Sequence, residues 1–324
     1  MIDRVLIGLD GSRGAEGALP HAVGLAEAYG AELVLLRVLE DAPTGAAPMD
    51  PVDWRMRHAE AEAYLNRAAA RIAERGLPVE WMVAEGNAAE EIVNAAGRRD
   101  VDLVVVGSQG KSGAPSPGLC STAQEVITGV GRSVLLVRYE DGPPSEDLSP
   151  ISYRRLLVPV DGSRRAEWAA CQATHLARSN SAELLLACVV PVPQTPMRPP
   201  LTPEDSELVE RLVERGRRWA EEYVEELRNR LMAPDLRVRA LVLVSPRVDE
   251  TLCELPARYD ADLVVVSAHG ASGEARWPYG SVASRLLTHG SVPVLVFQDQ
   301  AIPREQPVLA ESAADDSRSV RLAG

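Results

Sequence analysis

The chain has very little of three residue types: one lysine, one phenylalanine and four cysteines in 324 residues. The cysteines form no CxxC pair and no cysteine–histidine cluster with zinc spacing, so we expect free thiols and name no metal-ligating residue. No apolar run approaches the ~20 residues that span a bilayer. The amino terminus enters a strand-like run at once, which leaves no room for a signal peptide. The sequence therefore predicts a cytoplasmic protein that does not enter membranes.

Positive charge is also in short supply. The chain has 34 lysines and arginines and 47 aspartates and glutamates, which gives a formal net charge of −13. A charge of this sign repels phosphate backbones and anionic membrane surfaces at long range, so we expect neither nucleic acid nor membrane as a partner. Any phosphate must instead be held by local contacts.

What the chain does contain is a repeat of itself. Residues 4–13 (RVLIGLDGSR) reappear as residues 155–164 (RLLVPVDGSR), and residues 102–107 reappear as residues 262–267. A length of 324 residues suits two domains of ~150 residues. We predict domain 1 over residues 1–140, a linker over 141–153, domain 2 over 154–298 and a disordered acidic tail over 299–324.

Each copy alternates short aliphatic runs with amphipathic stretches, the pattern of βα units that feed a parallel sheet. In copy 1 we predict strands near 4–9, 32–38, 79–84, 102–107 and 133–137, with helices near 14–29, 51–75, 88–97 and 121–129. In copy 2 we predict strands near 155–160, 183–189, 236–244, 262–267 and 293–297, with helices near 165–179, 203–231, 247–258 and 280–289. The fold class is thus two tandem open α/β sheets.

In such sheets ligands bind beyond the carboxyl ends of the strands, where the strand order reverses. Asp10 and Asp161 each follow the first strand of their copy, where a carboxylate can accept hydrogen bonds from a base or a ribose. Asp-Gly-Ser is equally an ordinary helix-entry signal, in which the aspartate only caps the next helix. The two interpretations stay open from the sequence.

The segments after the fourth strands carry small residues in a repeated order. In copy 2, residues 267–270 (SAHG) are followed, after nine intervening residues, by Gly280 and Ser281 at a predicted helix start. Copy 1 has residues 107–110 (GSQG) and then, after the same gap, Cys120 and Ser121. Small residues let the backbone approach a phosphate chain, and amides at a helix start donate to anions. The pattern predicts a phosphate-binding loop.

Three other motifs are absent. Residues 110–112 (GKS) lack the first glycine of a Walker loop and are followed by glycine and prolines instead of a helix. Neither first strand leads into GxGxxG, which counts against NAD and FAD. No G-x-S-x-G is present, which counts against acyl hydrolysis by a catalytic triad.

These residues resemble the universal stress protein family, whose ATP-binding members carry G-x2-G-x9-G followed by Ser or Thr after strand four. Ser267 stands at the first glycine position in copy 2, and Cys120 at the third in copy 1. The resemblance implies adenine-nucleotide sites built from Pro159, Val160, Asp161, Val189, Ser267, His269, Gly270, Gly280, Ser281 and Val282 in copy 2, and from Asp10, Val38, Gly107, Gly110 and Ser121 in copy 1.

The resemblance also implies a five-stranded sheet in each copy, with the final strands pairing across a two-fold axis. In this chain the two copies would form an intramolecular pseudo-dimer and hide those strand edges. A further homodimer of chains stays open.

The leading functional hypothesis is a stress-response regulator or adaptor that binds ATP, AMP or ADP with Mg²⁺, and whose occupancy biases the choice of an unidentified regulatory protein partner. One alternative is a slow ATPase or phosphoryl-transfer enzyme, although no Walker-type lysine or evident water-positioning base is present and we name no catalytic residue. The other is an interaction scaffold without a ligand. We expect copy 2 to bind nucleotide more tightly, because Cys120 places a side chain, inert or redox-sensitive, at the phosphate loop of copy 1.

Overall fold

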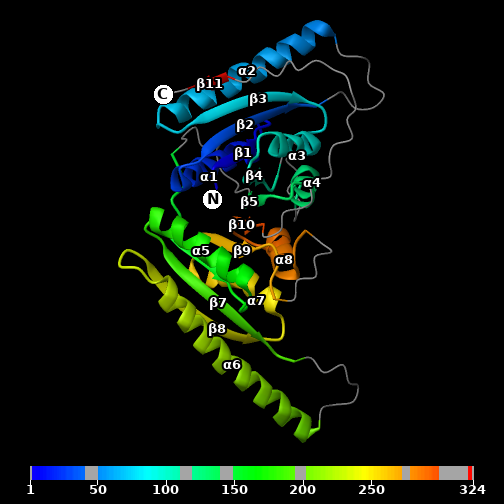
Figure 1. The fold of residues 1–324 in the computed structure, drawn as a ribbon. Coiled ribbons are helices and arrows are strands. Elements are labelled where there is room, and N and C mark those ends of the chain that lie inside the picture. The colour runs from blue at the N-terminus through cyan, green and yellow to red at the C-terminus, as the bar shows by residue number, and fades with distance from the viewer. Residues whose placement is uncertain are drawn as a thin grey trace. The chain divides into compact units, whose positions relative to one another are not determined.

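A computed structural model of the protein describes residues 2–40, 50–109, 119–138, 149–193, 202–271, 278–298 and 320–322. The chain forms two compact units (Figure 1): unit 1 comprises Met1–Ile151 with Gln300–Gly324, and unit 2 comprises Ser152–Asp299. The predicted linker lies mostly outside the described residues. The pseudo-dimer stays a prediction.

Unit 1 alternates strands and helices from its first described residues onward. Its elements are β1 (Arg4–Gly8), α1 (Arg13–Tyr29), β2 (Glu32–Leu39), α2 (Pro51–Ala73), β3 (Val79–Glu85), α3 (Ala88–Arg98), β4 (Leu103–Gly107), α4 (Ser121–Gly129), β5 (Ser133–Val137) and β11 (Val320–Leu322).

Unit 2 repeats this order. Its elements are β6 (Arg155–Pro159), α5 (Arg164–Ser179), β7 (Glu183–Pro191), α6 (Pro203–Leu231), β8 (Arg237–Ser245), α7 (Val248–Tyr259), β9 (Leu263–Ser267), α8 (Ser281–His289) and β10 (Val294–Phe297). In both units the bounds of the predicted strands and helices agree with the structure to within two residues, so the tandem α/β fold class is confirmed.

The strands of unit 1 pair in the order β3-β2-β1-β4-β5, and those of unit 2 in the order β8-β7-β6-β9-β10, all parallel. The chain moves outward from β1 to β3, then returns to β4 on the other side of β1. Because parallel crossovers are right-handed, this reversal puts α1 and α2 on one face and α3 and α4 on the other. In agreement, α3 and α4 pack against each other, as do α7 and α8 (Figure 1).

Aliphatic runs make these strands because both faces of a parallel sheet are covered. Val5, Leu6 and Ile7 of β1 are fully buried, and so are Leu156, Leu157 and Val158 of β6. Burying one such side chain contributes about 1.5–3 kcal/mol. Alanine side chains are small and let the helices pack close to the sheets. In α1, buried alanines recur every four residues at Ala18, Ala22 and Ala26.

One element was not predicted. Within the segment expected to be disordered, Val320–Leu322 forms β11, which pairs antiparallel with β3 at the outer edge of the unit 1 sheet. The rest of the tail lies outside the described residues. The described residues of unit 1 therefore form six strands, where five were expected.

Candidate functional site

Unit 2 has a cavity of about 350 Å³ at the carboxyl ends of its strands, where β6 and β9 meet at the reversal of strand order. Four segments that are distant in sequence contribute to it. All ten residues predicted for copy 2 line its wall: Pro159, Val160, Asp161, Val189, Ser267, His269, Gly270, Gly280, Ser281 and Val282.

The sequence prediction missed other parts of this wall. Val248 and Leu252, on the first turns of α7, add apolar residues to it, and Tyr279 stands directly before the N-cap of α8. The equivalent positions of copy 1 are Ala88, Ile92 and Leu119, which a comparison of the two copies position by position would have singled out.

Asp161 links two loops of the cavity. Its Oδ1 accepts a hydrogen bond from the Ser163 amide at 3.0 Å, and its Oδ2 accepts one from the Ala271 amide at 2.7 Å. Gly162 allows the first of these because its φ of 82° lies in the left-handed region that glycine adopts without strain. The N-cap of α5 is Ser163, whose hydroxyl accepts from the Ala166 amide at 3.2 Å. Asp161 therefore does not cap the helix.

Gly270 is small for a reason other than phosphate access. A Cβ added to this residue would lie 2.3 Å from Asp161 Oδ2, far inside van der Waals contact. Only glycine leaves room for the carboxylate to reach the Ala271 amide. Within the predicted phosphate-binding loop, residue 270 must therefore be glycine because the Asp161 carboxylate occupies the space that a side chain would fill.

The loop between β9 and α8 is closed at its base. The Gly280 amide donates to the Ala268 carbonyl at 2.7 Å, and the Ala268 amide donates to Phe297 at 2.8 Å. The Ser267 hydroxyl donates to the His269 carbonyl at 2.8 Å, and both residues are buried. The Gly280 amide is therefore engaged within the chain, which corrects the expectation that it donates to a phosphate.

Helix α8 nevertheless begins without a side-chain cap. Gly280 is its N-cap and makes no capping hydrogen bond, whereas Ser163 caps α5 and Thr202 caps α6. The first helical residues, Ser281 and Val282, line the cavity. Uncapped amides and the positive end of the helix dipole together favour an anion at this point.

Unit 1 has a cavity of about 360 Å³ in the same place. Four of the five residues predicted for copy 1 line it, namely Asp10, Val38, Gly107 and Ser121. The fifth, Gly110, lies outside the described residues. The Ser12 amide donates to Asp10 Oδ1 at 2.8 Å and Ser12 caps α1, so Asp10 has the same local role as Asp161.

The loop of unit 1 closes as in unit 2, through the Cys120 amide and the Ser108 carbonyl at 3.0 Å. Cys120 has φ −65° and ψ 158°, against −70° and 171° for Gly280. A Cβ on Gly280 would meet no atom closer than 3.5 Å. The chain itself therefore accepts a side chain at this position, and any penalty must come from contact with a ligand.

The two cavities differ in charge. Among the described residues that line each cavity, unit 2 has one carboxylate, Asp161, whereas unit 1 has two, Asp10 and Glu40. Glu40 follows β2 directly, and its counterpart in copy 2 is Pro191. Unit 1 is thus the less favourable of the two cavities for an anion.

Cys188 is buried in β7, and its pKa is raised to about 11 by burial and by the negative charge of Asp161. Its thiol is neutral at physiological pH and is a poor nucleophile. All four cysteines are free thiols.

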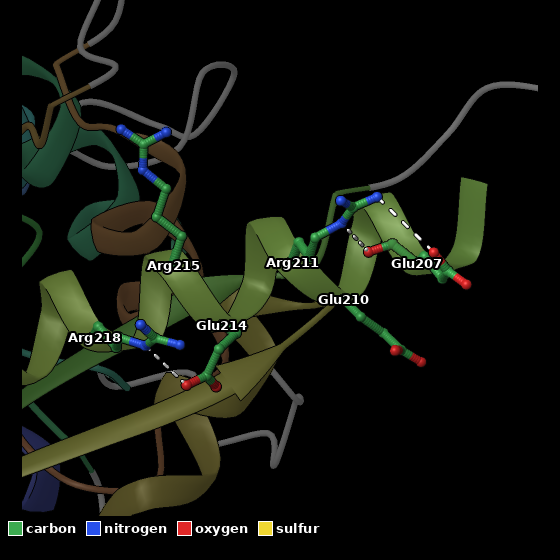
Figure 2. Close-up of a pocket in the computed structure, with 6 residues that line it drawn as sticks. All are labelled: Glu207, Glu210, Arg211, Glu214, Arg215 and Arg218. Carbon is green, nitrogen blue, oxygen red and sulfur yellow. Dashed lines mark hydrogen bonds and ion pairs between the residues drawn. The ribbon is translucent and has the colours of Figure 1, made fainter. Parts of the chain in front are cut away.

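Another hollow lies on the surface of α6 and has a different character. Figure 2 shows the six side chains around it, three glutamates and three arginines from one helix: Glu207, Glu210, Arg211, Glu214, Arg215 and Arg218. Two arginines pair with glutamates one turn earlier, at 4.0 Å and 3.1 Å. This charged helix surface brings together no loops and no buried polar group, so it is not the site.

Within the part of the chain that the structure describes, no group of three or more His, Cys, Asp or Glu side chains is arranged to hold a metal ion. No described helix is both long enough and apolar enough to cross a membrane.

Comparison with known proteins gives a consistent result. The profile of the Universal stress protein family matches residues 1–138 and again residues 152–298. A universal stress protein of Mycolicibacterium smegmatis is 26% identical over 303 residues, which cover 91% of this chain and 96% of that protein. Universal stress protein YxiE of Bacillus subtilis is 32% identical over 148 residues, 43% of this chain and 100% of that protein.

Solved structures show the same fold. A universal stress protein from Archaeoglobus fulgidus has a TM-score of 0.61 at 19% identity, covering 92% of this chain and 99% of that one. A putative universal stress protein from Pseudomonas aeruginosa has a TM-score of 0.63 at 15% identity, covering 91% and 93%.

Proposed function

Because this chain belongs to the universal stress protein family, with two copies of the family's domain, we propose that it is a regulator that binds an adenine nucleotide in unit 2. The observation that carries the proposal is the convergence of Asp161, the β9–α8 loop and the uncapped start of α8 around one cavity. Its volume of about 350 Å³ falls in the range of small-molecule sites.

The wall suggests how the ligand lies. The apolar side formed by Val189, Val248 and Leu252 suits a purine ring, and the start of α8 at Ser281 suits phosphates. Asp161, in the same wall, suits a ribose hydroxyl or an exocyclic amine as donor. Mg²⁺ would arrive with the phosphates, since it is commonly held by phosphate oxygens, water and one or two carboxylates.

Nucleotide occupancy is proposed to act by shifting the chain between states that a protein partner distinguishes, in the cytoplasm. Such a ligand can shift the equilibrium only as far as its affinity differs between the two states. Unit 1, with its second carboxylate and Cys120, is proposed to bind nucleotide more weakly.

The test is the nucleotide content of freshly purified protein, released by denaturation and separated by chromatography. We expect close to one adenine nucleotide per chain, or uptake of one on titration with ATP. Protein that neither retains nor takes up nucleotide would be the interaction scaffold instead. Turnover of the bound ATP by the same sample would point to the slow ATPase.

A further inference from the structure

Tyr279 is a residue of the unit 2 cavity, and its hydroxyl group is unpaired among the described residues. Tyr279 is one of the residues that line the cavity, and it is 8% exposed. Its hydroxyl oxygen is shielded from solvent and has no hydrogen-bond partner among the residues that the structure describes. Burial raises the pKa of the phenol above its usual range, so the group remains a neutral donor at physiological pH.

An unpaired buried hydroxyl is destabilising and is uncommon in native proteins, so it requires an explanation. The backbone of Tyr279 is held in place: its carbonyl accepts a hydrogen bond from the Ser284 hydroxyl at 3.4 Å, and Gly280 follows as the N-cap of α8. Tyr279 therefore lies next to the helix start where an anion is favoured. A bound ligand is the missing acceptor that this location suggests.

Copy 1 provides a natural comparison. Leu119 occupies the equivalent position, directly before the N-cap Cys120 of α4. Leucine can fill the same apolar volume but has no donor. Packing against the loop therefore does not require a hydroxyl at this position, and the hydroxyl of unit 2 needs a separate reason.

We propose that Tyr279 is a phosphate-binding residue of unit 2: on ligand entry its side chain changes rotamer and its hydroxyl donates a hydrogen bond to a phosphate oxygen held at the start of α8. This inference rests on the proposed function. Together with the amides of Ser281 and Val282, the hydroxyl would supply a third neutral donor to the anion. The hydroxyl is also a chemical difference between the two sites, because Leu119 gives unit 1 no such donor.

The experiment compares Tyr279→Phe with the unmodified full-length chain by calorimetric titration with ATP and with adenosine. We expect ATP affinity to fall about tenfold, as for loss of a hydrogen bond to a charged group, and adenosine affinity to stay the same. The melting temperature of the ligand-free variant should equal or exceed that of the unmodified protein, since an unpaired group has been removed. Tyr153→Phe is the matched control: Tyr153 is buried before β6, does not line the cavity, and should leave ATP affinity unchanged.

Each outcome decides the matter. Equal ATP affinity in Tyr279→Phe and the unmodified chain overturns the inference and leaves the proposed function standing. An equal loss for adenosine and for ATP overturns the assignment to phosphate. If the unmodified chain binds no ATP, the proposed function and the inference fail together.

Discussion

Gly270→Ala is the substitution for which the structure gives the sharpest expectation. The new Cβ would lie 2.3 Å from Asp161 Oδ2, so the carboxylate must move by roughly 1 Å to restore a normal contact. That movement breaks the 2.7 Å hydrogen bond from the Ala271 amide. A hydrogen bond to a charged acceptor contributes about 1.5–3 kcal/mol to stability. Because this one is exposed to solvent, we expect it to contribute about 1 kcal/mol.

The effect on folding should nevertheless be small. Replacing glycine by alanine restricts the unfolded chain and stabilises the fold by about 0.4–1 kcal/mol where the backbone permits. The two terms nearly cancel, so we expect a change in unfolding free energy within about 0.5 kcal/mol of zero. ATP affinity should fall about tenfold or more, because the displaced Asp161 carboxylate no longer faces the ligand.

Titration calorimetry and denaturant unfolding measure the two quantities. The control is the same change in an Asp161→Ala background, where the colliding oxygen is gone and Gly270→Ala should have no further effect on affinity. Gly280→Ala, whose Cβ meets no protein atom closer than 3.5 Å, serves as the control for stability. An equal loss of affinity in both Asp161 backgrounds would refute the reasoning.

Three further predictions concern single groups. Asp161→Ala should weaken ATP binding while α5 remains capped, whereas Ser163→Ala should lower the unfolding free energy by ~1 kcal/mol and leave affinity unchanged; the reverse pattern in calorimetry and melting curves would restore Asp161 as the cap. Alkylation at pH 8 followed by mass spectrometry should label exposed Cys171 quickly and Cys188 very slowly, since burial raises the pKa of Cys188 to about 11; equal rates would contradict this. Burial lowers the pKa of His21 to about 4, so between pH 6.5 and 4 the unfolded chain binds a proton that the folded chain does not, and stability falls as pH falls through that window. Between pH 7.5 and 4 the unmodified chain should therefore lose roughly 2 kcal/mol of unfolding free energy relative to His21→Gln. This value is discounted because His21 retains some solvent contact. Parallel pH dependence of the two proteins would count against the His21 prediction.

The strands and helices could be predicted from the sequence because each depends on a local pattern. The runs in β1 and β6 are aliphatic throughout, and such runs form strands wherever both faces of a sheet are covered. The location of the site followed in turn from the order of the elements, since the rule of right-handed crossovers fixes where the order reverses.

What could not be predicted depends on contacts distant in sequence. β11 has three residues, and only its pairing with β3 makes it a strand. The Asp-Gly-Ser entry allowed either residue to cap α5, and the choice of Ser163 became visible only when Asp161 was seen to reach the Ala271 amide, 110 residues away. The need for glycine at position 270 could not be predicted either, because it depends on the same contact between Asp161 and the Ala271 amide.

Glu40 provides a separate test of why the two units should bind nucleotide unequally. It lines the unit 1 cavity, and in water a carboxylate on the order of 8 Å from the three or four negative charges of ATP costs about 2 kcal/mol. Salt at 0.15 M has a Debye length of about 8 Å and reduces this to roughly 0.7 kcal/mol. Repulsion by charge therefore depends on salt, whereas a collision with the Cys120 side chain does not.

In an Asp161→Ala background that weakens unit 2, Glu40→Gln should raise the ATP affinity of unit 1 more than tenfold at low salt and only a few-fold at 0.15 M. Its effect on AMP should be smaller, because AMP carries fewer charges. Cys120→Gly should raise ATP affinity by a factor that salt leaves unchanged, with little change in stability since Gly280 has the same backbone conformation. If Glu40→Gln has no effect at low salt while Cys120→Gly restores binding, the difference between the units is steric, and the second carboxylate of unit 1 plays no part in it.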